Sequence, residues 1–416
     1  MSLESSTSSN PGRPSTQRAA AKAGNGLPPA DRILVVRLGA MGDVVRTLPS
    51  VAVLRSLYPG AHLAWLVEPA SAGVVEASGL VDEVIVFPRG ELVEALRAVD
   101  GLSFVRRLTG LLRKLRGRRF QLALDYHGLL KSGLLTWLSG AATRVGFARP
   151  IAREGASLFA NQLVYGVDSE SSRYARNAAL LAALAQPAAR ETVRRQAEGP
   201  AAGGGALLSV SPLAQARLAA RLRVAGRERA RGFALIHPGS SAGTRHKRYA
   251  PASWAEVGRR LAEAGVQVWV ATGPNRDERS LAEEIVRLGE GVLVLAPETR
   301  SIEDLIALQS RCGIFLACDS GPLHVASLVG VPVVQLLGPT HPAQNAPWSA
   351  GPVRRVRVPL PCSPCRRGCG DPACMRVLAP RTVARVALEL LEAERSEVES
   401  TGGEGTNDRE AGEAGA

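Results

Sequence analysis

Three loops in the second half of the chain contain residue types that bind phosphate. They span residues 237–247, 273–278 and 319–324, and each comes directly after a short apolar run. Such runs are typical of buried parallel strands, and in an open α/β sheet ligands bind where the carboxyl ends of the strands meet. A fourth loop, residues 338–342, follows another apolar run. We therefore expect these loops to converge on one phosphorylated ligand.

The first of these loops carries a cluster of cations. Lys247 lies between Arg245 and Arg248, with a histidine among them. A cation in this position would neutralise phosphate charge. The alternative is a solvated basic loop without a ligand.

The loop at 319–324 opens a predicted helix directly after a strand. Free N–H groups and the helix dipole at such a point suit a pyrophosphate, and His324, one turn into the helix, adds a donor. The alternative is ordinary capping by Asp319 or Ser320, with Pro322 in the first turn.

Asp43 is the candidate proton acceptor of the first half. It follows the strand predicted at 33–36 and a glycine-containing turn, and a helix begins there. A helix N-terminus stabilises a carboxylate, so Asp43 should be ionised and able to accept a proton. A plain N-cap aspartate is the alternative.

Four cysteines lie close together in a loop rich in Pro, Gly and Arg. Four thiols at this spacing can enclose a tetrahedral Zn²⁺, of structural rather than catalytic use; the residues are Cys362, Cys365, Cys369 and Cys374.

Several enzyme classes are disfavoured by the motifs that the sequence lacks. It contains neither G-x-G-x-x-G after a strand nor the Walker pattern, which argues against a nicotinamide enzyme and a P-loop ATPase. Residues 239–243 match G-x-S-x-G, but a hydrolase nucleophile elbow turns at once into a helix, and here polar residues intervene.

The elements that would position these residues alternate between strand and helix, which indicates parallel sheets. We expect two doubly wound sheets in tandem, the first closed by a strand at 143–147. Ser253 with Glu256 predicts a capping box, and Ser301 predicts another helix cap. The predicted organisation is a disordered leader (1–30), a first domain (31–186), a connection (187–231), a second domain (232–379) with the cysteine loop at 362–374, a helix (380–395) and a disordered acidic tail (396–416).

The charge of the 416-residue chain points to an anionic partner. The formal net charge is +13, and a long basic helix is predicted over about 91–115. No run approaches the length of a membrane span, and the first 25 residues lack the apolar core of a secretory signal. With six cysteines, a reducing cytosol is the expected location.

Taken in order, these motifs resemble those of the ADP-heptose:lipopolysaccharide heptosyltransferases, glycosyltransferase family nine. The resemblance spans Ile33 to about Leu391. It rests on Gly42-Asp43 with Pro49, Asp125 with Gly128-Leu129-Leu130-Lys131-Ser132, Arg153-Glu154 with Ser157-Leu158-Phe159, His237-Pro238-Gly239-Ser240 with Lys247, and Asp319-Ser320-Gly321 with His324 and Gly338-Pro339-Thr340. The two middle elements are most similar to the heptosyltransferase I branch, although Tyr126-His127 stands where a glutamine is common.

The resemblance implies a GT-B fold, with two Rossmann-like domains facing a cleft. It also implies an inverting transfer from ADP-heptose to Kdo–lipid A that needs no metal or other cofactor. The enzyme would be cytoplasmic and peripheral on the inner membrane, with the basic helix near its anionic acceptor. The same resemblance implies that Asp43 is the general base, with Gly42 and Lys131 on the acceptor side, and assigns donor contacts to Ser240, Ser241, Lys247, Glu278 (or its neighbour Asp277), Asp319, Ser320, Gly321 and His324.

Other functions stay open at this point. A family member with another sugar donor or acceptor in cell-envelope polysaccharide synthesis would share these motifs. The basic charge also fits a nucleic-acid-binding protein, but the sequence lacks aromatic stacking surfaces and a recognition module, so no nucleic acid is expected.

Overall fold

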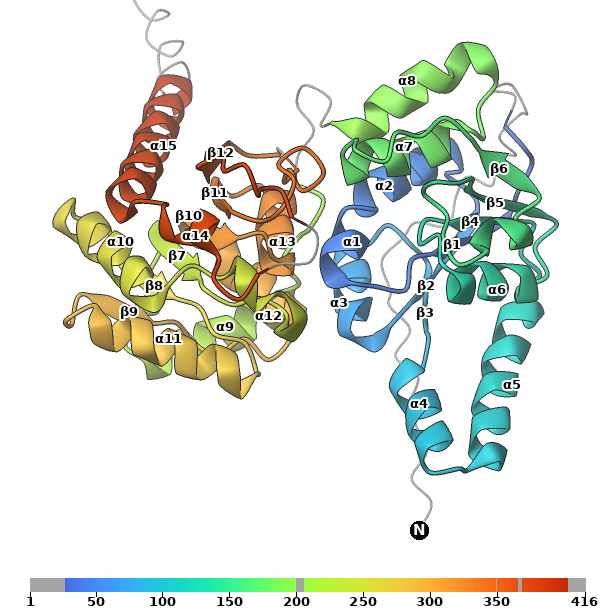
Figure 1. Ribbon diagram of the computed structural model, residues 1–416, viewed down its shortest axis with the longest axis horizontal. Helices are drawn as coiled ribbons and strands as arrows, with labels where there is room; N and C mark the ends of the chain where they lie inside the picture. Colours follow the sequence, from blue (N-terminus) through green and yellow to red (C-terminus); the bar gives the residue numbers. More distant parts are fainter. Residues whose placement is uncertain (1–26, 200–205, 349, 366–368, 403–416) are drawn as a thin grey trace, which may run out of the picture.

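The computed structural model describes residues 27–199, 206–348, 350–365 and 369–402. It contains two parallel six-stranded sheets, each in its own lobe, with helices on both faces (Figure 1). The strand orders are β3-β2-β1-β4-β5-β6 and β12-β11-β10-β7-β8-β9. Both follow the order of the doubly wound nucleotide-binding folds, in which the crevice lies where the order reverses. The predicted pair of tandem α/β sheets is therefore confirmed.

The first lobe runs from Leu27 to α8. Its strands are β1 (Arg32–Val36), β2 (His62–Val67), β3 (Glu83–Val86), β4 (Leu122–Asp125), β5 (Thr143–Phe147) and β6 (Gln162–Val164). Its helices are α1 (Met41–Val45), α2 (Leu48–Leu57), α3 (Pro69–Ser78), α4 (Arg89–Arg97), α5 (Gly101–Gly117), α6 (Leu130–Leu138), the short η1 (Ala156–Phe159), α7 (Arg173–Ala182) and α8 (Pro187–Glu198).

The second lobe repeats this arrangement. Its strands are β7 (Phe233–His237), β8 (Val268–Val270), β9 (Leu293–Leu295), β10 (Cys312–Cys318), β11 (Val333–Leu337) and β12 (Val353–Arg357). Its helices are α9 (Pro212–Val224), the 3-10 turn η2 (Ala242–Lys247), α10 (Pro251–Glu263), α11 (Arg276–Leu288), α12 (Ile302–Gln309), α13 (Gly321–Val329), α14 (Ala373–Arg376) and α15 (Pro380–Gly402).

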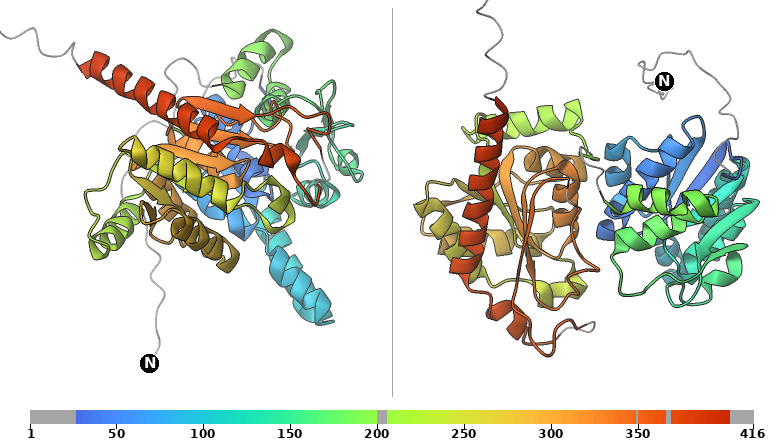
Figure 2. Two further views of the ribbon diagram at one scale, coloured as in Figure 1. Left: turned by 60° about the vertical axis from the view of Figure 1, so that its left-hand side comes forward. Right: turned by 90° about the horizontal axis from the view of Figure 1, so that it is seen from above.

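The central strands consist of apolar residues because both faces of each sheet are covered. Every residue of β7 and β11 is buried. In the first lobe α5 and α6 pack on one face, while α1, α2, α3, α7 and α8 pack on the other. The apolar cluster under α1, α2, α3, α7 and α8 extends into the other lobe, where it includes Ile306, Val325, Leu328 and Trp348. The lobes therefore share an apolar contact, and they lie side by side in Figure 1 and in the right view of Figure 2.

Several predicted boundaries are wrong. The first sheet ends at β6 rather than at 143–147, and the long basic helix is two helices, α4 and α5. Helix α10 begins at Pro251 after Ala250, so Ser253 and Glu256 form no capping box. The Ser301 cap is confirmed, since its side chain accepts a hydrogen bond from the Asp304 amide.

The predicted ends of the chain also differ from the structure. Leu27 and Ala30, which belong to the predicted leader, pack on the first lobe, and the Pro28 carbonyl accepts a hydrogen bond from Tyr58. Helix α15 continues past residue 395 to Gly402. Residues 1–26 and 403–416 lie outside the described residues. Among the residues that are described, no helix is long and apolar enough to cross a membrane.

Candidate active site

The candidate site lies where the two sheets reverse their strand order. Helix α1, which follows β1 of the first lobe, packs against α13, which follows β10 of the second. The approach is close: a Cβ on Gly42 would lie 3.7 Å from the Gly321 Cα, and one on Gly321 would lie 3.1 Å from the Met41 Sδ. Small residues on both sides therefore let the two helices meet.

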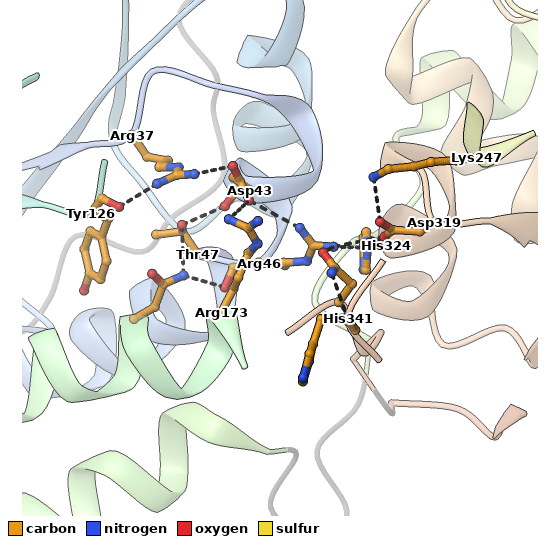
Figure 3. A network of polar contacts seen from close by, with 12 residues as sticks. Arg37, Asp43, Arg46, Thr47, Tyr126, Arg173, Lys247, Asp319, His324 and His341 are labelled. Carbon is orange, nitrogen blue, oxygen red and sulfur yellow. Dashed lines mark hydrogen bonds and ion pairs between the residues drawn. The ribbon is translucent and has the colours of Figure 1, made fainter. Parts of the chain in front are cut away.

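Asp43 lies among three arginines of its own lobe (Figure 3). Its carboxylate pairs with Arg37 at 2.5 Å and with Arg46 and Arg173 at 3.2 Å each. Burial alone would raise the pKa of Asp43, but the three guanidinium groups outweigh it and hold the pKa well below its usual range. Asp43 is therefore ionised at neutral pH. It lies inside α1 and is not the N-cap, which is Ala40.

Arg46 joins the two lobes. Its Nη1 contacts the Asp43 Oδ1 at 3.2 Å, while its Nη2 lies 3.4 Å from the Asp319 Oδ1 and 3.3 Å from the Asn345 Oδ1. The Nη2 also donates to the His324 ring nitrogen Nε2. Burial and this cation lower the pKa of His324 to about 4, so the ring is neutral at neutral pH. One buried guanidinium thus connects the acid of α1 with the loop before α13 (Figure 3).

Lys247 holds the other oxygen of Asp319. The Lys247 Nζ donates to the Asp319 Oδ2 at 2.9 Å. Burial would raise the pKa of Asp319, but His324, Arg46 and Lys247 together hold it well below its usual range. The structure therefore brings Lys247, Asp319 and His324 together from two loops that the sequence separates by about seventy residues.

The N-terminus of α13 has an unused hydroxyl. Ser320 is the N-cap of α13, yet its side chain makes no capping hydrogen bond. Its buried Oγ has no partner among the described residues, and neither has the Oγ1 of Thr340 in the next loop. Buried polar atoms are normally paired, so the unpaired Ser320 hydroxyl at the free amides of the α13 N-terminus fits a phosphate.

The serines of the first loop behave differently from each other. The buried Ser240 donates its Oγ to the Thr244 carbonyl at 3.2 Å and accepts from the Arg248 Nε at 3.0 Å. The exposed Ser241 shares a 2.8 Å hydrogen bond with the Thr244 hydroxyl. Ser240 therefore fixes the loop, while Ser241 faces solvent.

Glu278 lies against the ends of two strands. A Cβ on Gly239 would be 2.9 Å from one carboxylate oxygen of Glu278, and a Cβ on Gly273 would be 2.7 Å from the other. Burial raises the pKa of Glu278. Its neighbour Asp277 is exposed and pairs with Arg245. Of these two acids, Glu278 is the one beside the loops that follow β7 and β8.

A basic cavity opens beside Asp43 in the first lobe. Its volume is about 350 Å³, and Asp43 and Glu68 are the acids that line it. Of the two residues predicted on the acceptor side, Lys131 lines this cavity and donates a hydrogen bond to Glu68 at 2.9 Å. Gly42 does not line it and faces the second lobe. The cationic side chains of the lining are Arg37, Arg89, Lys131, Arg153, Arg173 and Arg176. Such a cavity suits a ligand with several negative charges.

Three arginines of the site were missed by the sequence analysis. Arg37 directly follows β1, and Arg46 lies one turn after Asp43, so spacing could have indicated both. Arg173 comes from α7, far along the chain, and no local signal connects it with Asp43.

The proposed zinc site is not supported by the structure. All four cysteines are described, although residues 366–368 between them are not. Within the described residues, no group of three or more His, Cys, Asp or Glu side chains could hold a metal ion. Cys374 is buried beside Gly338, whose Cβ would be 3.0 Å from its sulfur, and burial together with Cys365, Cys369 and Cys362 raises the pKa of its thiol.

Comparison with known proteins places these motifs in context. Residues 108–371 match the family model of glycosyltransferase family 9 (heptosyltransferase). Lipopolysaccharide heptosyltransferase 1 of Pseudomonas aeruginosa is 27% identical over 339 residues, which cover 80% of this chain and 86% of that protein. Lipopolysaccharide heptosyltransferase 1 of Escherichia coli K12 is 23% identical over 317 residues, covering 75% and 89%.

Solved structures of such enzymes share the fold. ADP-heptose heptosyltransferase II of Escherichia coli superposes with a TM-score of 0.65 at 19% identity, covering 88% of this chain and 99% of that one. The Escherichia coli heptosyltransferase WaaC with ADP gives a TM-score of 0.62 at 20% identity, covering 86% and 99%. The two-lobed GT-B architecture is therefore confirmed.

Proposed function

This chain belongs to glycosyltransferase family nine, the heptosyltransferases, and from that premise we propose that it transfers heptose from ADP-heptose to the Kdo–lipid A inner core of lipopolysaccharide. ADP-heptose stands in the name of the Escherichia coli structure, and the Pseudomonas aeruginosa and Escherichia coli relatives are both named lipopolysaccharide heptosyltransferase 1. The step we propose is the first heptose addition, with inversion at the anomeric carbon.

The observation that carries this proposal is the position of Arg46 between two acids. It contacts Asp43 in one lobe and Asp319 in the other, both within 3.4 Å. A donor held at the loop of Asp319 and Lys247 would therefore present its sugar to the carboxylate of Asp43. Reaction of a donor in one lobe with an acceptor in the other needs this proximity.

In the proposed step the acceptor hydroxyl attacks the anomeric carbon of the heptose from the side opposite ADP. The bond between that carbon and the diphosphate oxygen breaks, and its electron pair leaves with ADP. The hydroxyl proton passes to the Asp43 carboxylate, which is ionised at neutral pH because of its three arginines. One C–O bond forms and one breaks, and the configuration inverts.

The departing ADP gains negative charge, and the second lobe offers groups that stabilise it. These are the Lys247 ammonium, the unpaired Ser320 hydroxyl and the first amides of α13. Preorganised donors of this kind lower the barrier without rearranging during the reaction. We propose that they suffice without a divalent cation and that Glu278 receives the adenosine ribose.

The basic cavity would hold the acceptor. The Kdo sugars carry carboxylates and lipid A carries phosphates, which match the cations around Asp43 and Lys131. An acceptor carboxylate that pairs with Arg173 would also weaken the ion pair between Arg173 and Asp43, and the pKa of Asp43 would then rise. Because this acceptor is lipid-anchored, we propose that the enzyme works at the cytoplasmic face of the inner membrane.

The test is transfer by the purified protein from radiolabelled ADP-heptose to Kdo–lipid A. Transfer should persist in EDTA, product NMR should show an inverted anomeric centre, and UDP-sugars should not replace the donor. Absence of both transfer and ADP-heptose hydrolysis would refute the assignment. Efficient transfer from a different nucleotide sugar would keep the family and change the substrate.

A further inference from the structure

Helices α4 and α5 form a hairpin that projects from the first lobe. The projection is plain in Figure 1 and again after rotation in the left view of Figure 2. The part of the hairpin that belongs to the core is its base, where Leu111 and Leu115 of α5 pack with Leu135 of α6 against the sheet. The distal half therefore contributes little to the core of the lobe.

The distal half carries large apolar side chains in water. Four of them define what we call the hairpin tip: Leu96 (60% exposed), Val99 (89%), Leu102 (81%) and Val105 (54%). Isolated apolar residues on a surface are ordinary, but a group at the end of a projection marks a contact surface. The outer side of the adjacent α6 is apolar as well, through the exposed Leu130, Leu134 and Trp137.

The backbone of the tip is unfavourable for the residue it carries. Val99 has a φ of 54°, in the left-handed region. A β-branched residue is an outlier there, and glycine or asparagine would be more stable. An exposed valine with this backbone conformation lowers local stability. Residues in such strained conformations cluster at sites that contact ligands.

Positive charge flanks the tip. Arg107 pairs with Glu91 and Lys114 with Glu83. Across the part of the chain that the structure describes, Arg97 and Arg113 have no ion-pair partner; Arg106 has none within 4 Å, although its charge helps to lower the pKa of the exposed Asp100 in the turn. An apolar tip with unneutralised arginines is the combination by which amphipathic helices bind anionic membranes.

The hairpin starts at the basic cavity. Arg89, the first residue of α4, lines that cavity. The nine residues of α4 then span about 13 Å along the helix axis. Because interfacial segments enter a bilayer by about 5–10 Å, an inserted tip would leave the cavity in water, within reach of a lipid headgroup.

We propose that the hairpin tip inserts into the interface of an anionic lipid bilayer, with Arg97, Arg106 and Arg113 against the lipid phosphates. The cavity then faces the same bilayer. That the bilayer delivers a lipid-anchored acceptor rests on the proposed function, whereas binding of the hairpin to lipid does not.

The test measures binding of the full chain to vesicles of phosphatidylcholine alone and of phosphatidylcholine mixed with phosphatidylglycerol. The wild type should float with the mixed vesicles and far less with the neutral ones. Leu102→Ser with Val105→Ser should weaken binding by about tenfold or more, given the apolar area removed. The matched control, Leu213→Ser with Val224→Ser on α9, removes a leucine and a valine that are at least 66% exposed on the other lobe and should bind like the wild type.

Two further variants separate insertion from a structural role. Val99→Asn should raise the thermal midpoint, because asparagine tolerates this backbone, and should weaken vesicle binding. Arg106→Gln and Arg113→Gln should each lower affinity for the mixed vesicles by about fivefold. The control for both is Arg223→Gln, at an exposed arginine of α9, and it should leave the affinity for the mixed vesicles unchanged.

Activity distinguishes this proposal from the proposed function. The Leu102→Ser, Val105→Ser variant should keep wild-type transfer to a deacylated, soluble Kdo acceptor and lose transfer to the same acceptor in vesicles. Equal vesicle binding by wild type and variant would overturn membrane insertion even if transfer is intact. A wild-type dimer that this variant converts to monomers would assign the tip to a contact between copies and overturn it too.

Discussion

Replacement of Arg46 by methionine tests whether one side chain couples the lobes. The variant loses contacts with Asp43 at 3.2 Å and with Asp319 at 3.4 Å, at a position that is almost fully buried. Removing one partner of a buried ion pair costs about 3–5 kcal/mol. Asp43 keeps Arg37 and Arg173, and Asp319 keeps Lys247, so we expect a loss at the lower end, about 3 kcal/mol.

A double-mutant cycle isolates the part of this energy that crosses between lobes. Arg46→Met and Asp319→Asn are made singly and together, and the free energy of unfolding is measured in urea by circular dichroism and tryptophan fluorescence. Contacting pairs couple by about 0.5–3 kcal/mol. We expect about 1–2 kcal/mol here, because the Arg46 Nη2 is shared with His324 and Asn345.

The matched cycle uses a pair within the first lobe. Arg55 and Asp82 are 2.5 Å apart but partly exposed, so their coupling should be below about 1 kcal/mol. If the two Arg46 and Asp319 substitutions are additive to within about 0.5 kcal/mol, the lobes are not coupled by Arg46 and the proposed geometry of the closed site is wrong.

Three further predictions concern the second lobe. Burial lowers the pKa of His237 to about 4, so between that value and about 6.5 the unfolded chain binds the proton that the folded chain does not. His237 should therefore lower the free energy of unfolding by about 2 kcal/mol as the pH drops from about 7 to about 5. In urea titrations at both pH values, His237→Gln should show a pH dependence smaller than that of the wild type by this amount. Ser320→Ala removes an unpaired buried hydroxyl, so it should leave stability unchanged or raise it by about 1 kcal/mol while weakening ADP binding; a stability loss without an effect on ADP would contradict the phosphate role. Gly273→Ala forces the Glu278 carboxylate to move and should weaken ADP binding by about tenfold in calorimetry, whereas Gly60→Ala, whose Cβ meets nothing within 4 Å, should have no effect.

Much of the fold could be predicted because parallel strands are buried on both faces. β1 after Arg32 and β7 before His237 are continuous apolar runs, β11 is interrupted only by Gln335, and the loops after these strands stand out by their polar residues. The strands that were missed are at the sheet edges. β6 has no fully buried residue and β12 contains three arginines, so neither shows the apolar signature of a central strand.

Two helix boundaries were predicted wrongly from the sequence: the break between α4 and α5 and the start of α10. The break between α4 and α5 includes Val99, which is not a helix-breaking residue type. It ends at Asp100, which caps α5 by accepting a hydrogen bond from the Ser103 amide, a start signal that the sequence analysis did not use. At α10, Pro251 occupies the first turn, a position that proline favours, and this moves the start ahead of Ser253.

The candidate site was predictable as far as its loops, but not in its electrostatics. The pattern of residues indicates that Asp43 and the 319–324 loop each follow a strand. It does not indicate that Arg173 from α7 would reach Asp43 or that Arg46 would reach Asp319 in the other lobe, because these contacts depend on tertiary packing. The low pKa of Asp43 follows from those arginines rather than from the helix N-terminus that the sequence suggests.

The most direct test of the account is the rate of heptosyl transfer by Asp43→Asn compared with Glu68→Gln, the other acid of the cavity. Asparagine keeps the shape of Asp43 but cannot accept the proton, so kcat should fall by about 100-fold to 10,000-fold, with ADP binding unchanged. Glu68→Gln should keep most of the wild-type kcat. A nearly active Asp43→Asn, or loss of turnover in Glu68→Gln alone, would show that Asp43 is not the base.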